Sequence, residues 1–331
     1  MPVSDLPPAP LVEAPVLPMP PLLAGFRLLR AEDLTDEQRL AYAAQFRNIP
    51  RPPKLLDHLL SSNFVKAASS AQLVELIAGE PLIASRVLMV TNSPMFGLET
   101  PVGSIGQAVT YLGLNKVRSL CLQYILIDSF KADSPERKRV LDSVWTASAL
   151  ASELTQQLGQ RLGFEDRGSL VSAVVLSFIG RLATTASVSR DQLAILAAAS
   201  GLLARTIAEQ ATLGLGAAQI GRLLMNDWGL PATIVDDAAE IDAVLYTPST
   251  DFEAERADRL ALCYLCARLG ERLAEGELKD LSRFDASAET SPEFFHLRSY
   301  LASSTLKRLG PAVRSPDIGE AVTRTLAAMH V

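Results

Sequence analysis

Apolar residues recur every three to four positions over most of the chain. The segment "AQLVELIAG", for example, places Leu73, Val74, Leu76 and Ile77 along one side before Gly79. This period is that of an α-helix with one buried face, and alanine and leucine take the place of the β-branched runs that strands prefer. The pattern therefore predicts an all-α protein built as a multi-helix bundle.

Helix start and stop signals divide this pattern into segments. Pro81 suits the first turn of a helix that runs to about Thr91. Ser104 can cap a helix that Gly113 terminates, and Asn115 can cap the next one. Six later segments each predict a helix or a helix pair: residues 143–159, 169–186, 190–214, 217–231, 231–246 and 251–276. We expect the last of these to be a strong amphipathic helix that ends near Gly270 or Gly276.

The same signals suggest four parts of the chain. Residues 1–25 alternate proline with small apolar residues, which favours a disordered, extended tail that serves as a tether or docking strip. A short helical segment at residues 26–49 precedes a main domain over residues 50–275. Residues 276–331 form a C-terminal helical extension.

Composition and charge narrow the class of protein. The 331 residues are 48% hydrophobic and carry a net charge of −6, which opposes non-specific binding to a nucleic-acid backbone. No apolar run reaches the roughly 18 to 20 uncharged residues of a bilayer span, and the N-terminus lacks the pattern of a signal peptide. We therefore expect a cytoplasmic protein that does not bind membranes, with nucleic acid disfavoured as a partner.

Several motifs in a fixed order match a known family. The segment "GEPLIASRVLMVTNSPMFGL" precedes "PVGSIGQAVTYLGLNKVRSL", and "VWTAS", "LSFIGRL" and "IGRLLMNDWGLP" follow. The residues that carry the match are Asn92, Ser93, Phe96, Gly97, Gly113, Arg118, Trp145, Gly180, Trp228 and Pro231. Over about residues 48–275 the sequence resembles the HDOD domain, a bacterial signalling module related to the HD superfamily of metal-dependent phosphohydrolases. The resemblance implies an HD-like helical bundle.

The resemblance also implies where metal ligands would lie. HD enzymes hold metal ions with imidazoles and carboxylates, and the ions activate water against a phosphate ester. The corresponding positions here are Ala147, Ser177, Phe178 and Ala217, which supply neither group. The histidines of the chain are His58, His296 and His330. We therefore expect no metal, no cofactor and no enzymatic activity, with Phe178 and Ala147 filling the former metal cavity with apolar volume.

Some shorter features have two interpretations. "QAVTYLGLNKVRSL" has the form of a DNA-reading helix-turn-helix, but its second helix continues with so many apolar residues that core packing is favoured. Cys263 and Cys266 form a C-x-x-C inside a helix, which favours two buried thiols over a redox pair or half of a zinc site. We therefore expect both segments to lie in the hydrophobic core.

Two groups of charged residues also have both a structural and a functional interpretation. Asp236, Asp237, Glu240 and Asp242 could chelate a cation, although a solvated acidic face is the favoured interpretation. Arg118 and Arg181 lie among apolar neighbours. Such an arginine either anchors the bundle or presents its guanidinium to an anionic ligand or a partner, and anchoring is favoured.

The function expected from these features is non-catalytic regulation through binding of another protein. The resemblance implies a bacterial signalling pathway, with cyclic dinucleotides or two-component systems as the usual context. A nucleotide- or nucleic-acid-binding regulator is the alternative, and a metal-dependent phosphohydrolase is less favoured. The identity of the partner and the oligomeric state stay open.

Overall fold

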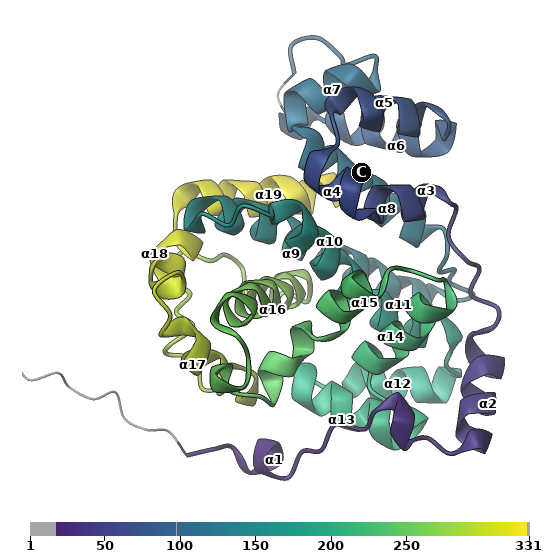
Figure 1. The fold of residues 1–331 in the computed structure, drawn as a ribbon, viewed down its shortest axis with the longest axis vertical. Helices are drawn as coiled ribbons and strands as arrows, with labels where there is room; N and C mark the ends of the chain where they lie inside the picture. Colours follow the sequence, from purple (N-terminus) through teal and green to yellow (C-terminus); the bar gives the residue numbers. More distant parts are fainter. Residues whose placement is uncertain (1–17, 97, 330–331) are drawn as a thin grey trace, which may run out of the picture.

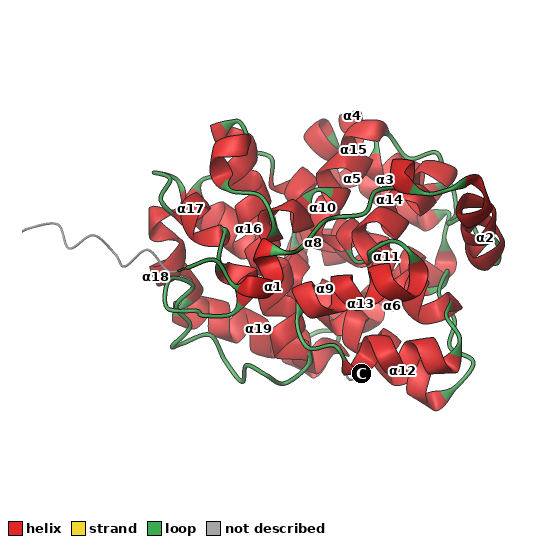
Figure 2. Ribbon diagram, turned by 90° about the horizontal axis from the view of Figure 1, so that it is seen from below, coloured by secondary structure: helices red, strands yellow, loops and turns green. Residues whose placement is uncertain are grey.

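The computed structural model describes residues 18–96 and 98–329, and every regular element in these residues is a helix (Figures 1 and 2). The prediction of an all-α fold is confirmed. Gly97 and residues 1–17 of the predicted tail lie outside the described residues.

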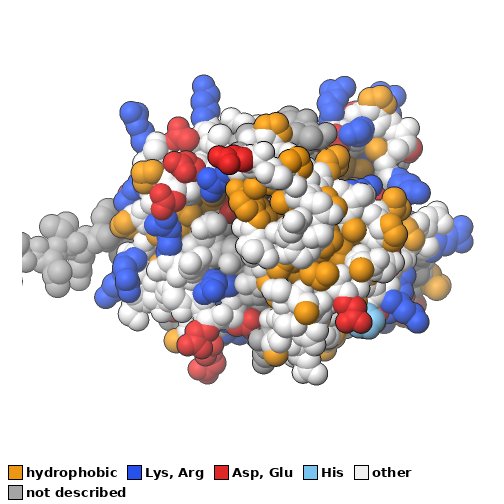
Figure 3. Space-filling view, turned by 90° about the horizontal axis from the view of Figure 1, so that it is seen from above, with side chains coloured by type: hydrophobic (Ala, Val, Ile, Leu, Met, Phe, Trp, Pro, Cys, Tyr) orange, Lys and Arg blue, Asp and Glu red, His pale blue; other side chains and the backbone are white. Residues whose placement is uncertain are grey.

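The first part of the fold contains eight α-helices. These are α1 (Pro21–Ala24), α2 (Asp36–Phe46), α3 (Leu55–Leu60), α4 (Ser62–Ala67), α5 (Ser70–Ala78), α6 (Pro81–Thr91), α7 (Ile105–Leu112) and α8 (Leu114–Ile127). Figure 1 shows α5, α6 and α7 grouped at one end of the molecule. Figure 3 views this end and shows hydrophobic side chains gathered on it; Leu82, Met89 and Tyr111 are among those exposed.

The second part forms the body of the bundle. Its helices are α9 (Pro135–Leu162), α10 (Arg167–Ser177), α11 (Ile179–Ser187), α12 (Arg190–Ala198), α13 (Leu202–Leu213), α14 (Ala217–Asp227), α15 (Ala232–Ala239), α16 (Ala254–Ala274), α17 (Leu297–Leu301), α18 (Leu309–Val313) and α19 (Pro316–Met329). Short 3-10 turns link some of the helices, such as Pro94–Phe96 between α6 and α7 and Ile241–Leu245 between α15 and α16. One hydrophobic core runs from Leu23 to Val322, so the segments outside residues 50–275 pack on the same core.

The two long helices α9 and α16 pack against each other at the centre. A Cβ added to Gly270 of α16 would overlap the carbonyl oxygen of Ala147 and lie 2.9 Å from the Ala151 nitrogen, so glycine permits this approach. Most residues of α16 are buried, on all of its sides. The prediction of an amphipathic helix is therefore wrong here. Of the two predicted ends, the one near Gly276 is confirmed, because α16 continues past Gly270 to Ala274.

The ends of α7 and α8 around Gly113 agree with the sequence prediction in part. The Ser104 hydroxyl accepts a hydrogen bond from the Gln107 amide at 3.2 Å and caps α7, as predicted. Gly113 has a φ of 85°, a conformation that glycine adopts without strain, and it separates α7 from α8. Because α8 already begins at Leu114, the prediction that Asn115 caps it is wrong.

One stretch is apolar enough to resemble a membrane span. Arg167–Ser187, which comprises α10 and α11, has the length and mean hydropathy of such a span, although Arg181 divides it, so no uncharged run of 18 residues occurs there. Within the bundle, 78% of its apolar window is buried. Burial of this kind is typical of core helices in a globular protein.

Candidate functional site

A pair of glycines lets α11 and α14 cross in close contact. A Cβ on Gly180 would overlap the Ala217 carbonyl oxygen and lie 2.9 Å from the Gly221 nitrogen. A Cβ on Gly221 would in turn lie 3.0 Å from the Gly180 nitrogen. This crossing brings the first residue of α14 beside the turn between α10 and α11, where Phe178 lies.

Three of the four positions that the family resemblance identified lie at one small cavity. Ser177, Phe178 and Ala217 line a space of about 30 Å³, which is room for roughly one or two water molecules. Phe178 is 3% exposed. Ala147 is not among the residues that line this cavity and is buried on α9 against Gly270, the neighbour of Glu271.

The rest of the cavity is lined by charged side chains. Glu271 of α16 places its Oε1 2.7 Å from Arg181 Nη1 and 2.7 Å from Arg205 Nη2, and its Oε2 2.7 Å from Arg268 Nη1. These four side chains are at most 15% exposed. Burial alone would raise the pKa of Glu271, but the three arginines outweigh it and hold the pKa at about 2. Phe178 therefore shares the lining of this cavity with an ionic cluster, which the sequence does not predict.

Three further carboxylate side chains lie near the arginines that surround Glu271. Glu275 accepts a hydrogen bond from Arg181 Nη2 at 2.8 Å, and Asp242 lies 3.5 Å from Arg268 Nη2. Glu209, 2% exposed, accepts a hydrogen bond from the Ala217 amide at 2.6 Å. Burial raises the pKa of Glu209 to about 7, since its arginine neighbours compensate only in part. The cluster therefore neutralises itself and contains one carboxyl group that titrates near neutral pH.

The donors around the cavity do not fit an HD-type metal centre. Over residues 18–96 and 98–329, no group of three or more His, Cys, Asp and Glu side chains lies close enough to share an ion. The carboxylates nearest the cavity are engaged by guanidinium or amide groups. The cavity is also too small for a phosphate ester.

The buried carboxyl group of Glu209 predicts a pH-dependent stability. Its folded-state pKa of about 7 lies above the ordinary value of 4.5, so between these pH values the folded state keeps a proton that the unfolded state has lost. Stability should therefore fall by about 3 kcal/mol as the pH rises through this window. Urea unfolding of the wild type and Glu209→Gln at pH 5, 6, 7 and 8 measures it.

The glutamine variant should lose less stability than the wild type between pH 5 and pH 8. Glu271 does not interfere, because its pKa is lowered and it stays ionised over this range. Equal slopes for the two proteins would show that Glu209 is not the titrating group.

Arg118 and Arg181, proposed from sequence as anchors or ligand contacts, are both buried. Arg181 belongs to the ionic cluster. Arg118 is fully buried, donates a hydrogen bond to the Gly168 carbonyl oxygen and lies 3.3 Å from the Ser172 hydroxyl. Burial lowers the pKa of Arg118 to about 10. These contacts favour anchoring over recognition of an external anion.

The remaining motif residues shape turns and packing. Phe130 lies between Trp145 and Trp228, with ring centroids 6.3 and 6.4 Å away. Pro231 precedes the first turn of α15. Ser93 is 4% exposed, and its hydroxyl has no hydrogen-bond partner among the described residues.

The Asn92 side chain makes two hydrogen bonds to the loop between α6 and α7. Its Nδ2 donates to the Val102 carbonyl oxygen at 2.8 Å, and its Oδ1 accepts from the Val102 amide at 2.6 Å. The Tyr111 hydroxyl donates to the Phe96 carbonyl oxygen at 2.7 Å. This part of the family motif therefore forms the edge of a groove.

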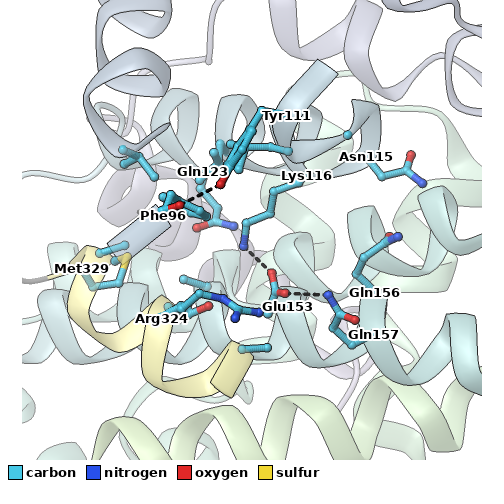
Figure 4. A pocket seen from close by; sticks show the side chains of 18 of the residues that line it. Phe96, Tyr111, Asn115, Lys116, Gln123, Glu153, Gln156, Gln157, Arg324 and Met329 are labelled. Atoms are coloured by element: carbon cyan, nitrogen blue, oxygen red, sulfur yellow. Dashed lines mark hydrogen bonds and ion pairs between the residues drawn. The ribbon is translucent and has the colours of Figure 1, made fainter. Parts of the chain in front are cut away.

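That groove lies between α8, α9 and α19 and has a volume of about 640 Å³ (Figure 4). Phe96 and Tyr111 line it together with Arg324 and Met329 of α19. Lys116 of α8 reaches across to Glu153 of α9 in an ion pair. The volume is within the range of ordinary ligand sites, unlike that of the small cavity.

The sequence did not identify this groove or most of the ionic cluster. Of the cluster, Arg181 belongs to a family motif, and the sequence favours a solvated acidic face for Asp242. That expectation is wrong for Asp242, which lines the cavity. Its neighbours also pair with arginines, as in Asp236 with Arg222 at 2.5 Å.

The other short motifs lie in the core as predicted. Cys263 and Cys266 are buried free thiols, and burial raises the pKa of Cys266 to about 12. Helix α8 is buried from Val117 to Gln123. These residues of the predicted helix-turn-helix therefore pack in the core.

Comparisons with known proteins agree with this architecture. A family model described as the HDOD domain matches residues 49–244. An HDOD domain protein of unknown function from Geobacter sulfurreducens is 18% identical, with a TM-score of 0.64 over 89% of this chain and 99% of that one. No curated protein sequence matches this chain.

Two further solved structures share the fold. A protein from Shewanella amazonensis, provisionally described as a phosphohydrolase, is 19% identical with a TM-score of 0.56, covering 86% of this chain and 98% of that one. A protein from Marinobacter aquaeolei, provisionally described as a signal transduction protein, is 16% identical with a TM-score of 0.53, covering 94% of this chain and 64% of that one. At such identities the likeness concerns the fold alone.

Proposed function

This chain belongs to the HDOD domain family, and we propose that it is a non-catalytic signalling protein that acts by binding another protein. The ionic cluster around Glu271 carries this proposal. A phosphohydrolase needs metal ligands and room for its substrate at the same place. Here three of the four positions expected to hold ligands adjoin a cavity of about 30 Å³ whose lining includes arginine–carboxylate pairs.

The electrostatics of the cluster support the same conclusion. A divalent cation at the cavity would lie beside Arg181, Arg205 and Arg268, and like charges repel strongly in a buried site. Releasing Glu271 to bind such an ion would leave those three guanidinium groups without their shared partner. The cluster and a metal centre therefore exclude each other.

We also propose that the protein works in the cytoplasm. The apolar stretch Arg167–Ser187 is committed to the core of the bundle, where α10 packs on α9 and α11 packs on α14. Inserting it into a bilayer would dismantle that core.

The proposal predicts that the purified full-length chain does not hydrolyse phosphate esters. The test measures release of p-nitrophenol from bis-p-nitrophenyl phosphate and p-nitrophenyl phosphate, with Mn²⁺, Fe²⁺ or Mg²⁺ supplied. We expect rates equal to those of buffer with metal alone. Hydrolysis that rises with protein concentration and is abolished by EDTA would refute the non-catalytic assignment.

A further inference from the structure

The floor of the groove between α8, α9 and α19 is a row of polar side chains. Glu153, Gln156, Gln157 and Gln160 recur every three to four residues along α9 and therefore share one face of that helix. Gln123 of α8 adds another amide beside them. A primary amide both donates and accepts hydrogen bonds, as does the backbone of a peptide.

One of these amides has an oxygen without a hydrogen-bond partner among the described residues. The Oε1 atom of Gln156 is buried and has no hydrogen-bond partner among the described residues. A buried acceptor left unpaired costs about 1–3 kcal/mol. A ligand that donates a hydrogen bond to this oxygen would recover that cost, so this part of the groove favours a donor such as a backbone N–H.

The charges of the groove are already neutralised. Lys116 pairs with Glu153, whose Oε1 also accepts a hydrogen bond from Gln157 Nε2 at 3.0 Å. Arg324 of α19 lies 3.6 Å from Glu320. Among the described residues that line the groove, every cation thus has a carboxylate partner. A phosphate-bearing ligand would find no free positive charge there, whereas a neutral ligand would not need one.

The other surfaces of the groove are apolar. Ala321, Ala328 and Met329 face it from α19, and Leu120 and Ile127 face it from α8. These surfaces can bury aliphatic side chains of a ligand while the amides of α9 contact its main chain. The groove runs along α9 from Ala149 to Gln160, roughly 16 Å at 1.5 Å per residue, which matches about five residues of extended chain.

We propose that this groove binds an extended peptide segment of the protein partner, about five residues long and without net negative charge. The glutamines of α9 hydrogen-bond the peptide backbone, and the α19 and α8 surfaces take its apolar side chains. This inference rests on the proposed function, since it supplies the binding surface that a non-catalytic module requires.

The test uses the full-length chain and a displayed library of random dodecapeptides. Enriched peptides are synthesised, and their affinities are measured by calorimetry with the wild type and three variants. Gln156→Ala removes the unpaired amide, Ala328→Trp fills the groove from the α19 side, and Asn226→Ala removes an exposed amide on α14 as a matched control. Circular dichroism verifies that each variant is folded.

We expect enriched peptides to bind Gln156→Ala about 5- to 10-fold more weakly, the effect of losing roughly one hydrogen bond. Ala328→Trp should weaken binding at least 10-fold, and Asn226→Ala should leave it unchanged. The inference is overturned if no peptide is enriched. It is also overturned if the enriched peptides bind both groove variants as tightly as they bind the wild type. ATP and GTP binding are measured in parallel. Nucleotide binding by the wild type that is lost in Gln156→Ala and Ala328→Trp would also overturn the inference.

The outcome separates the two proposals. An inactive chain without groove-dependent peptide binding refutes the peptide groove and leaves the non-catalytic assignment standing. A chain that hydrolyses the phosphate esters but binds peptides in the groove refutes only the non-catalytic assignment.

Discussion

Replacement of Glu271 by glutamine is expected to destabilise the protein by about 3–5 kcal/mol, which is the cost of leaving buried charges without a partner. Glu271 is the shared partner of three arginines whose side chains are at most 15% exposed. Glutamine has nearly the same shape but no charge, so it keeps the packing and removes the counterion. The free energy of urea-induced unfolding at pH 7.5 measures the effect.

Glu275→Gln is the matched control. Its carboxylate pairs with Arg181 alone and is 30% exposed, so solvent can replace it and the expected loss is below about 1 kcal/mol. In the Glu271→Gln background, Arg268→Met should restore part of the lost stability, because it removes one of the unpaired charges. A loss below about 1 kcal/mol for Glu271→Gln would mean that solvent reaches the arginines and that the cluster is not closed.

Replacement of Gly180 by alanine is expected to cost at least about 3 kcal/mol, at the upper end of what overpacked cores lose. The added Cβ would overlap the Ala217 carbonyl oxygen, which is backbone and cannot rotate away as a side chain does. Helices α11 and α14 would have to separate, and this separation would widen the cavity beside Phe178. Thermal and urea unfolding followed by circular dichroism measure the loss.

Gly319→Ala provides the comparison. Gly319 lies inside helix α19, and a Cβ there would meet no atom within 4 Å. Alanine at this position should leave stability unchanged or raise it by up to about 1 kcal/mol. Similar losses for the two variants would contradict the close crossing at Gly180.

The periodic pattern was sufficient to predict the fold because most helices bury one face and end at clear signals. Ser104 marks the start of α7 and Gly113 marks its end, and both act as the sequence predicts. Helix α16 was misread as amphipathic because it is buried on all sides, including at Arg268 and Glu271. Charged residues in a helix indicate an exposed face unless tertiary partners neutralise them.

Those partners could not be found from spacing. Arg181 and Arg205 lie 90 and 66 residues from Glu271 in the sequence, and only the folded bundle brings them together. Arg181 belongs to a family motif, but nothing in the sequence links it to Glu271.

The groove was missed for a similar reason. Its walls come from α8, α9 and α19, and α19 lies more than 150 residues beyond α9 in the chain. Glutamines at three- to four-residue spacing on α9 form no recognised motif, and on a helix such residues ordinarily face solvent.

We propose that an arginine–carboxylate cluster occupies the place where the family resemblance puts the metal ions of HD enzymes. Anomalous diffraction at the manganese edge, from crystals of the full-length chain soaked in MnCl₂, tests it most directly. We predict no anomalous peak at the cavity lined by Ser177, Phe178 and Ala217, with Glu271 still bound by its three arginines. A manganese peak within bonding distance of Glu209 or Asp242 would contradict the account.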